Sequence, residues 1–209
     1  MKAALAVALT LALALAAGGC DDPAKGKTKV TTSEAQPVTA AHEGASTYAF
    51  DGTTSRVEWV GAKVTGKHDG GFKSFRGTVK LDPAAPEKGT VSVEIDTASL
   101  FTDNDKLEGH LKSADFFDVE KHPKASFVST SASKADGKWK ITGNLTLHGV
   151  TKSITFPADV RVGSASVDVD AEFAINRKDF GIVYAGKPDD LIRDDVVIKL
   201  AIRATKQSS

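Results

Sequence analysis

The chain has 209 residues, enough for one domain with an appendage, since globular domains usually contain about 100–150 residues. Hydrophobic residues make up 41% and charged residues 26% of the sequence, a balance that supports a buried core and excludes disorder along the whole chain. Lys and Arg together number 27, as do Asp and Glu, and this zero net charge argues against nucleic acid as a partner.

The N-terminus predicts export and lipid attachment. An apolar run from Ala3 to Ala17 is shorter than the roughly 20 residues of a membrane span and is typical of a signal peptide core. Gly18 and Gly19 come directly before Cys20, the only cysteine, and this arrangement resembles the lipobox of bacterial lipoproteins, in which the cysteine is acylated. We therefore expect residues 1–19 to be a lipoprotein signal peptide and Cys20 to anchor the chain at the periplasmic side of the envelope. A conventional signal peptide with a chance cysteine is the alternative.

Residues 20–47 are predicted to be the lipidated cysteine followed by a flexible tether. The stretch is rich in Thr, Ala, Ser and Lys, and has no aromatic residue. Such a composition buries too little apolar surface to offset the entropy of ordering. The tether would let the following domain reach away from the membrane.

Residues 48–206 show the alternation of apolar and polar residues that is typical of half-buried antiparallel strands, and residues 207–209 form a short tail. In the run from Val91 to Asp96, for example, apolar side chains occupy every second position. In the first strand the apolar phase changes at Gly61, which predicts a bulge there. Pro157 lacks an amide donor and predicts an edge position or a bulge in its strand.

One segment interrupts the strands with a helical pattern. Residues 102–111 open with residues that commonly cap helices and place Leu107 and Leu111 four apart, with Gly109 as a weak point. About eight strands with one short helical insertion in a domain of this size predict a small closed barrel, whose interior can be solid or can hold one small ligand.

Four motifs in chain order resemble those of the YceI-like family of polyisoprenoid-binding proteins. They begin at Ser55, Asp103, Gly143 and Arg177, and their sequences are SRVEWVGAKVTGKHDGGFKSFRG, DNDKLEGHLKSADFFDV, GNLTLHGVT and RKDFGI. The resemblance extends over about residues 48–204. It implies an all-β, eight-stranded antiparallel, lipocalin-like barrel with a long apolar pore that holds an isoprenoid or similar lipid tail. It implies no catalytic residues. Many relatives are simply secreted, so the lipoprotein signal is a departure.

The candidate ligand-binding residues are the large side chains expected to point into the pore, and two charged residues near a strand end. The apolar candidates are Trp59, Phe72, Phe75, Phe116, Phe117, Trp139, Ile141, Leu145, Phe156, Phe173, Ile175 and Phe180. The alternative is that these side chains fill a solid barrel. Arg177 and Asp179 are candidates for contact with a polar head group, with a structural ion pair or turn contact as the alternative.

Catalytic and metal chemistry are not predicted. The five histidines have neither H-x-H nor HExxH spacing, so a metal site would have to be assembled across loops, and we expect none. A G-x-S-x-G nucleophile motif is absent from the sequence. We expect a binding protein with no cofactor, an apolar lipid such as a polyisoprenoid or quinone as its ligand, and a second copy of the chain as a candidate partner.

Two other classes of protein are weighed against a lipid carrier. A ligand-free envelope or stress-associated interaction module would have a solid core and use the helical insertion, with Phe116 and Phe117, to contact a partner. An outer-membrane barrel would need aromatic girdles, which 2 Trp and 2 Tyr cannot build. The lipid carrier is the function that the sequence favours.

Overall fold

The computed structural model describes residues 22–42, 44–135 and 137–208. The signal peptide and Cys20 predicted from the sequence lie outside these residues. The strands are β1 (Ser46–Asp51), β2 (Arg56–Lys63), β3 (Gly66–Phe72), β4 (Phe75–Leu81), β5 (Thr90–Asp96), β6 (Leu100–Thr102), β7 (Lys124–Ala135), β8 (Lys138–Leu147), β9 (Val150–Val162), β10 (Ser166–Asn176), β11 (Gly186–Lys187), β12 (Asp190–Leu191) and β13 (Asp195–Lys206). The helices are η1 (Pro86–Lys88), η2 (Thr97–Ser99), α1 (Asp105–Lys112) and η3 (Arg177–Phe180). None of them is long and apolar enough to cross a membrane, as far as the described residues extend.

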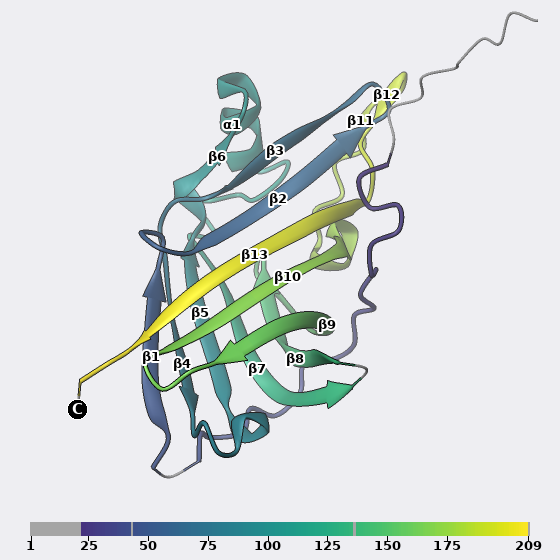
Figure 1. Cartoon of the computed structure of the whole chain (residues 1–209). Helices are drawn as coiled ribbons and strands as arrows, with labels where there is room; N and C mark the ends of the chain where they lie inside the picture. The colour runs from purple at the N-terminus through teal and green to yellow at the C-terminus, as the bar shows by residue number, and fades with distance from the viewer. Residues whose placement is uncertain (1–21, 43, 136, 209) are drawn as a thin grey trace, which may run out of the picture.

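Eight strands close into an antiparallel barrel. Neighbours pair in the order β1, β4, β5, β7, β8, β9, β10 and β13, and the pairing of β1 with β13 completes the ring (Figure 1). A ribbon of β2, β3 and β6 continues from the other part of β13. The predicted fold, a lipocalin-like antiparallel barrel with one short helix, is confirmed.

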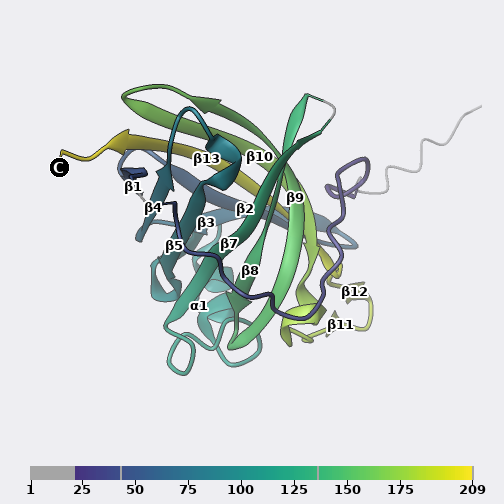
Figure 2. The same ribbon diagram turned by 90° about the horizontal axis from the view of Figure 1, so that it is seen from below.

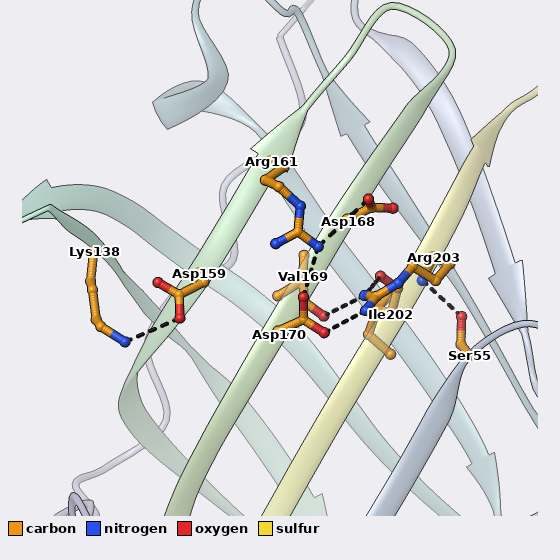
Figure 3. Close-up of polar contacts among 9 residues, drawn as sticks. All are labelled: Ser55, Lys138, Asp159, Arg161, Asp168, Val169, Asp170, Ile202 and Arg203. Atoms are coloured by element: carbon orange, nitrogen blue, oxygen red, sulfur yellow. Dashed lines mark hydrogen bonds and ion pairs between the residues drawn. The ribbon is translucent and has the colours of Figure 1, made fainter.

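Alternation along the strands separates an apolar interior from a charged outer face. On β10, Val169 and Phe173 line the interior. Asp170 points outward, where it accepts hydrogen bonds from Nη2 of Arg203 at 2.6 Å and from Nη2 of Arg161 at 2.8 Å (Figure 3). Because successive side chains of a strand point to opposite faces, the charged residues between the apolar ones of β10 lie on the outside of the barrel.

Helix α1 lies at one end of the barrel together with the segments 113–123 and 181–194, and we call this the α1 end (Figure 1). The helix begins after Asn104, whose side-chain oxygen accepts a hydrogen bond from the amide of Leu107 at 3.0 Å. This bond satisfies one of the amides that a helix leaves without an internal partner. Tyr184 contacts both His110 and Phe116, with ring centroids 5.0 and 5.4 Å apart, so the three segments of the α1 end form one packed group.

Strands β9 and β10 pair along only part of their length, and the N-terminal residues fill the remaining seam. The paired part joins residues 159–162 to residues 167–170. Further along, Val30 donates its amide to the carbonyl of Ala174 at 2.9 Å, while Ser33 and Ser153 exchange two backbone hydrogen bonds of 3.0 and 2.9 Å. Residues 22–36, which we call the N-terminal strap, therefore bond to both edges of the seam and run along the outside of the barrel (Figure 2).

The strap differs from the flexible tether expected for residues 20–47. Only two of its side chains are buried: Val30 belongs to the interior core cluster, and Ala24 packs against Val60, Ala174 and Val197. Its order comes from backbone hydrogen bonds to the unpaired edges of β9 and β10 and from ion pairs between its lysines and carboxylates on the outside of the barrel. A strand edge without a partner strongly favours such backbone pairing. The low apolar content of the strap therefore does not predict that it is ordered.

Candidate functional site

An apolar cavity of about 520 Å³ occupies the interior of the barrel. Its lining runs from Lys63 and Lys187 at the α1 end to Leu81 and Pro86 at the opposite end. The side chains between these ends are almost entirely aliphatic and aromatic. A cavity of this size falls within the range of about 300–1,000 Å³ that is usual for small-molecule sites.

The structure brings eleven of the fourteen predicted site residues to the cavity wall. Phe156 and Phe173 stack with ring centroids 4.4 Å apart, and Phe72 meets the edge of Phe117 at 5.7 Å. These aromatic pairs come from different strands and from segment 113–123, so the wall is built by residues that are distant in the sequence. The eleven are Trp59, Phe72, Phe116, Phe117, Trp139, Ile141, Leu145, Phe156, Phe173, Ile175 and Arg177.

Three predicted residues do not line the cavity. Phe75 packs inside a second core cluster with Tyr48 and Val79, and Phe180 is completely buried within η3. Asp179 accepts a hydrogen bond from Oγ1 of Thr32 at 2.9 Å and so helps to hold the strap instead of facing a ligand. For Phe180 and Asp179 the period of two gives no direction, because both belong to a helical turn.

Arg177 lines the cavity, but its guanidinium group is used by the protein itself. Its Nε and Nη1 atoms donate to the carbonyls of Arg193 at 3.1 Å and Ile182 at 2.7 Å. The side chain is 5% exposed, and this burial lowers the pKa of Arg177. The residue thus joins η3 to both ends of segment 181–194, which is the structural role that the sequence left open as an alternative.

Several wall residues escaped the prediction from sequence. Phe127, on β7, follows the same alternation as its neighbours and could have been found from that signal. Phe50 lies on the short strand β1, and its ring occupies the space beside Gly77, where a Cβ atom would approach it within 2.2 Å. Tyr184 and His110 lie outside the barrel strands, so no periodic pattern marks them.

Two buried donors on the wall have no hydrogen-bond partner among the described residues. They are Nε1 of Trp59 and Nε of Arg193. The indole of Trp59 lies against Gly70, where a Cβ atom would come within 2.2 Å of Cζ2. A buried N–H group without a partner costs about 1–3 kcal/mol, so an acceptor atom on a bound molecule would relieve a real penalty here.

The α1 end supplies the charged part of the wall. Lys63 forms an ion pair with Asp190, and the hydrogen bond from Lys63 lowers the pKa of the Asp190 carboxyl group. Arg193 lies 3.7 Å from Asp22, the first described residue of the strap. The cavity is therefore apolar along its length and polar at this end.

Comparisons with known proteins agree with this geometry. A curated UPF0312 protein of Pseudomonas putida is 39% identical over 137 residues, covering 62% of this chain and 71% of its own length. A UPF0312 protein of Pectobacterium atrosepticum is 37% identical over 144 residues, covering 66% of this chain and 73% of its own length.

Solved structures show the same architecture. BcnA of Burkholderia cenocepacia is 30% identical, with a TM-score of 0.67 over 75% of this chain and 99% of its own. A domain from Saccharophagus degradans, described as polyisoprenoid binding, is 18% identical with a TM-score of 0.62, over 77% of this chain and 98% of its own, and shows the likeness of fold. The model of the YceI-like domain matches residues 48–204. With its barrel, its apolar interior and this match over most of its length, the chain belongs to the YceI-like family.

Proposed function

We propose that the protein binds the tail of a polyisoprenoid or quinone-like lipid inside the barrel, as a carrier or a store. The observation that carries the proposal is the apolar cavity of about 520 Å³ that extends between the two ends of the barrel. Membership of the YceI-like family supports the proposal, as does the similar fold of the Saccharophagus degradans domain that is described as polyisoprenoid binding.

The size of the cavity suits a lipid tail. An apolar cavity of about 150 Å³ binds one benzene molecule, so a volume near 520 Å³ has room for about 20 carbon atoms, or roughly four isoprene units. Burial of each methylene contributes about 0.8 kcal/mol, which for this number of carbons can exceed the cost of association, about 4–15 kcal/mol. Apolar contact alone is therefore enough for tight binding.

A ligand with an oxygen acceptor fits the wall better than a pure hydrocarbon does. The Nε1 atom of Trp59 and the Nε atom of Arg193 are donors that no described residue uses. Both nitrogens are buried, so a quinone carbonyl would accept a hydrogen bond from either of them once a small side-chain shift exposes it. This feature favours a quinone-like lipid among the isoprenoids.

We also infer that the protein works at the periplasmic side of the cell envelope, held there by acylated Cys20. The support for this is the sequence alone, in which the single cysteine follows an apolar leader and two glycines. The proposed role requires binding and release of a lipid and no chemical change of it.

The test is native mass spectrometry of the purified full chain, followed by organic extraction. We expect a bound mass in the range of polyisoprenoids or quinones. A folded protein that is empty, and that takes up neither added quinone nor added polyprenol, would overturn the proposal and favour an interaction module.

Two wall variants and one control sharpen the test. Phe173→Asp places a charge in the apolar interior, and Leu145→Trp fills part of the cavity while keeping it apolar, so we expect both to carry much less lipid. Thr155→Asp adds the same carboxylate to the outer face of β9, where the side chain is exposed, and should keep the wild-type load. If Leu145→Trp is folded and fully loaded, the lipid lies elsewhere.

A further inference from the structure

Asp118, His122 and His148 come together beside the α1 end of the barrel. One potential ligand atom of each residue lies within 4.8 Å of the others. All three side chains are half-buried, and none of them lines the lipid cavity. The group is thus separate from the site discussed above.

The backbone fixes two of these residues on one turn. The amide of His122 donates to the carbonyl of Asp118 at 2.8 Å, which is the spacing of a single helical turn. The two ends of this turn lie close together, which brings the carboxylate of Asp118 next to the imidazole of His122.

The third residue is supplied by the tight hairpin between β8 and β9. His148 and Gly149 both have positive φ values, 51° and 75°, as a two-residue type I′ turn requires. The ring of His122 lies directly over this turn, because a Cβ atom on Gly149 would approach its Cε1 within 2.6 Å. The two imidazole centroids are 4.7 Å apart.

The hydrogen bonds around the cluster suit a cation. Lys121 donates a hydrogen bond to Asp118 at 2.9 Å, and this bond lowers the pKa of the carboxyl group. Nδ1 of His148 lies 3.3 Å from the carbonyl of Phe180. In the tautomer that donates this hydrogen bond, Nε2 carries a free lone pair, which is the usual arrangement of a metal-binding histidine.

We propose that Asp118, His122 and His148 bind a divalent transition-metal ion such as Zn²⁺, which fastens segment 113–123 to the β8–β9 hairpin. Two imidazoles and one carboxylate are a common ligand set for zinc and its neighbours in the first transition row. Three protein ligands leave a position for water, in keeping with the partial exposure of the group. The histidine spacing gave no hint of the site because the ligands come from two loops.

The ion pair between Asp118 and Lys121 is the competing role for the carboxylate. The Lys121 side chain is 73% exposed, so its ammonium group can leave the carboxylate at little cost. Lys121→Met separates the two roles. It should leave metal affinity unchanged or raise it, since it removes a competing cation.

The experiment uses the full chain, purified without a histidine tag and treated with a chelator. Zn²⁺ is titrated by calorimetry, and Co²⁺ is added as a spectroscopic probe whose visible bands report bound nitrogen ligands. We expect one ion per chain with a Kd of about 1 µM or tighter.

Each ligand has a conservative variant. His148→Asn suits the positive φ of the turn, Asp118→Asn keeps the shape of the side chain, and His122→Gln keeps an amide in place of the ring. Each should weaken metal binding at least tenfold, because even the loss of a residue that only hydrogen-bonds to a metal ligand typically costs about tenfold or more in affinity. Asp115→Asn is the control, since Asp115 forms an ion pair with His110 at 2.9 Å, lies outside the cluster and does not line the lipid cavity.

Two results would overturn the proposal: no stoichiometric uptake of Zn²⁺, or uptake that survives in all three ligand variants. Circular dichroism of each variant shows whether the fold is retained. Metal is measured independently of lipid, so failure here leaves the lipid proposal standing, and an empty lipid cavity would not affect this test.

Discussion

Trp59 has a structural role, and the proposed function gives the same side chain a role in ligand recognition. Its ring covers Gly61 and Gly70, and the absence of a Cβ atom at Gly70 allows this close approach. Its Nε1 atom is buried on the cavity wall without a partner among the described residues. Under the proposed function, the ring would supply apolar surface to a bound tail, and the N–H group would distinguish among ligands by their oxygen atoms.

Replacing Trp59 by Phe should lower the affinity for a quinone more than that for a hydrocarbon. The variant keeps an aromatic surface but removes a hydrogen bond with a net value of about 0.5–1.5 kcal/mol, which corresponds to roughly a 2- to 13-fold loss. Competition binding, read by native mass spectrometry, would compare a long-chain quinone with squalene. Equal losses for the two ligands would mean that Nε1 does not contact the bound molecule.

Asp170 on the outer face gives a pH-dependent contribution to stability. Hydrogen bonds from Arg203 first and then Arg161 lower the pKa of this carboxyl group in the folded protein (Figure 3). Its contribution is therefore present above the unfolded-state pKa of about 3.9 and is lost as the pH falls through the lower folded-state value.

We expect Asp170→Asn to lower the free energy of unfolding at pH 7 by about 1 kcal/mol or less, since the group is partly exposed. The difference from wild type should shrink toward zero in strong acid. Urea denaturation at both pH values checks this. Asp168→Asn is the control, because its contact with Arg161 is longer, at 3.7 Å. A difference that is the same at both pH values would exclude ionisation as the cause.

At the scale of elements, the N-terminal strap explains two features of the sequence pattern. Val60 breaks the alternation of β2, and the sequence predicted a bulge at Gly61 to account for this. The strand instead pairs with β3 without a shift in register, and Val60 is apolar because Ala24 of the strap covers it on the outside. Pro157 fits its predicted edge position, because β9 has lost β10 as a neighbour at that point.

Ser33→Pro should loosen the strap. Proline removes the amide that donates to Ser153, and it restricts the residue before it. We expect faster hydrogen exchange at the amide of Ser153, which donates to the carbonyl of Ser33, and a smaller effect at Ala174. Thr39→Pro, an exposed position outside the bonded stretch, should leave both amides protected. Unchanged protection in Ser33→Pro would show that the strap contributes little to closing the seam.

At the scale of the whole molecule, the sequence predicts the barrel well and the cavity less well. Alternation determines which side chains point inward, as for Phe156 and Phe173, and so most of the wall could be predicted. It does not determine whether an inward side chain reaches the cavity or is covered by its neighbours. Phe75 points inward but is buried in a core cluster and does not line the cavity. Whether a barrel is hollow depends on the packing of all its layers, which no local pattern contains.

Binding of a long-chain quinone should stabilise the entire barrel. At a free concentration of about 100 times Kd the gain is about 2.7 kcal/mol, which for a chain of this size raises Tm by roughly 5–10 °C. Thermal unfolding of the delipidated full chain, with and without the quinone, measures the shift. A water-soluble quinone without a tail should give almost no shift. An equal shift from the head group alone would place the binding energy outside the apolar cavity.

The contact between Asp22 and Arg193 has a consequence for how the molecule would sit on a bilayer. Asp22 lies at the polar end of the cavity, and Cys20 precedes it by two residues, a distance of at most about 7 Å along an extended chain. If Cys20 is acylated, the barrel stands with this end toward the lipid surface, and it is not separated from the membrane by a long flexible tether. A cargo molecule could then pass between bilayer and barrel without exposing its tail to the aqueous phase, and delivery to a distant membrane would require the partner to come to the anchored protein.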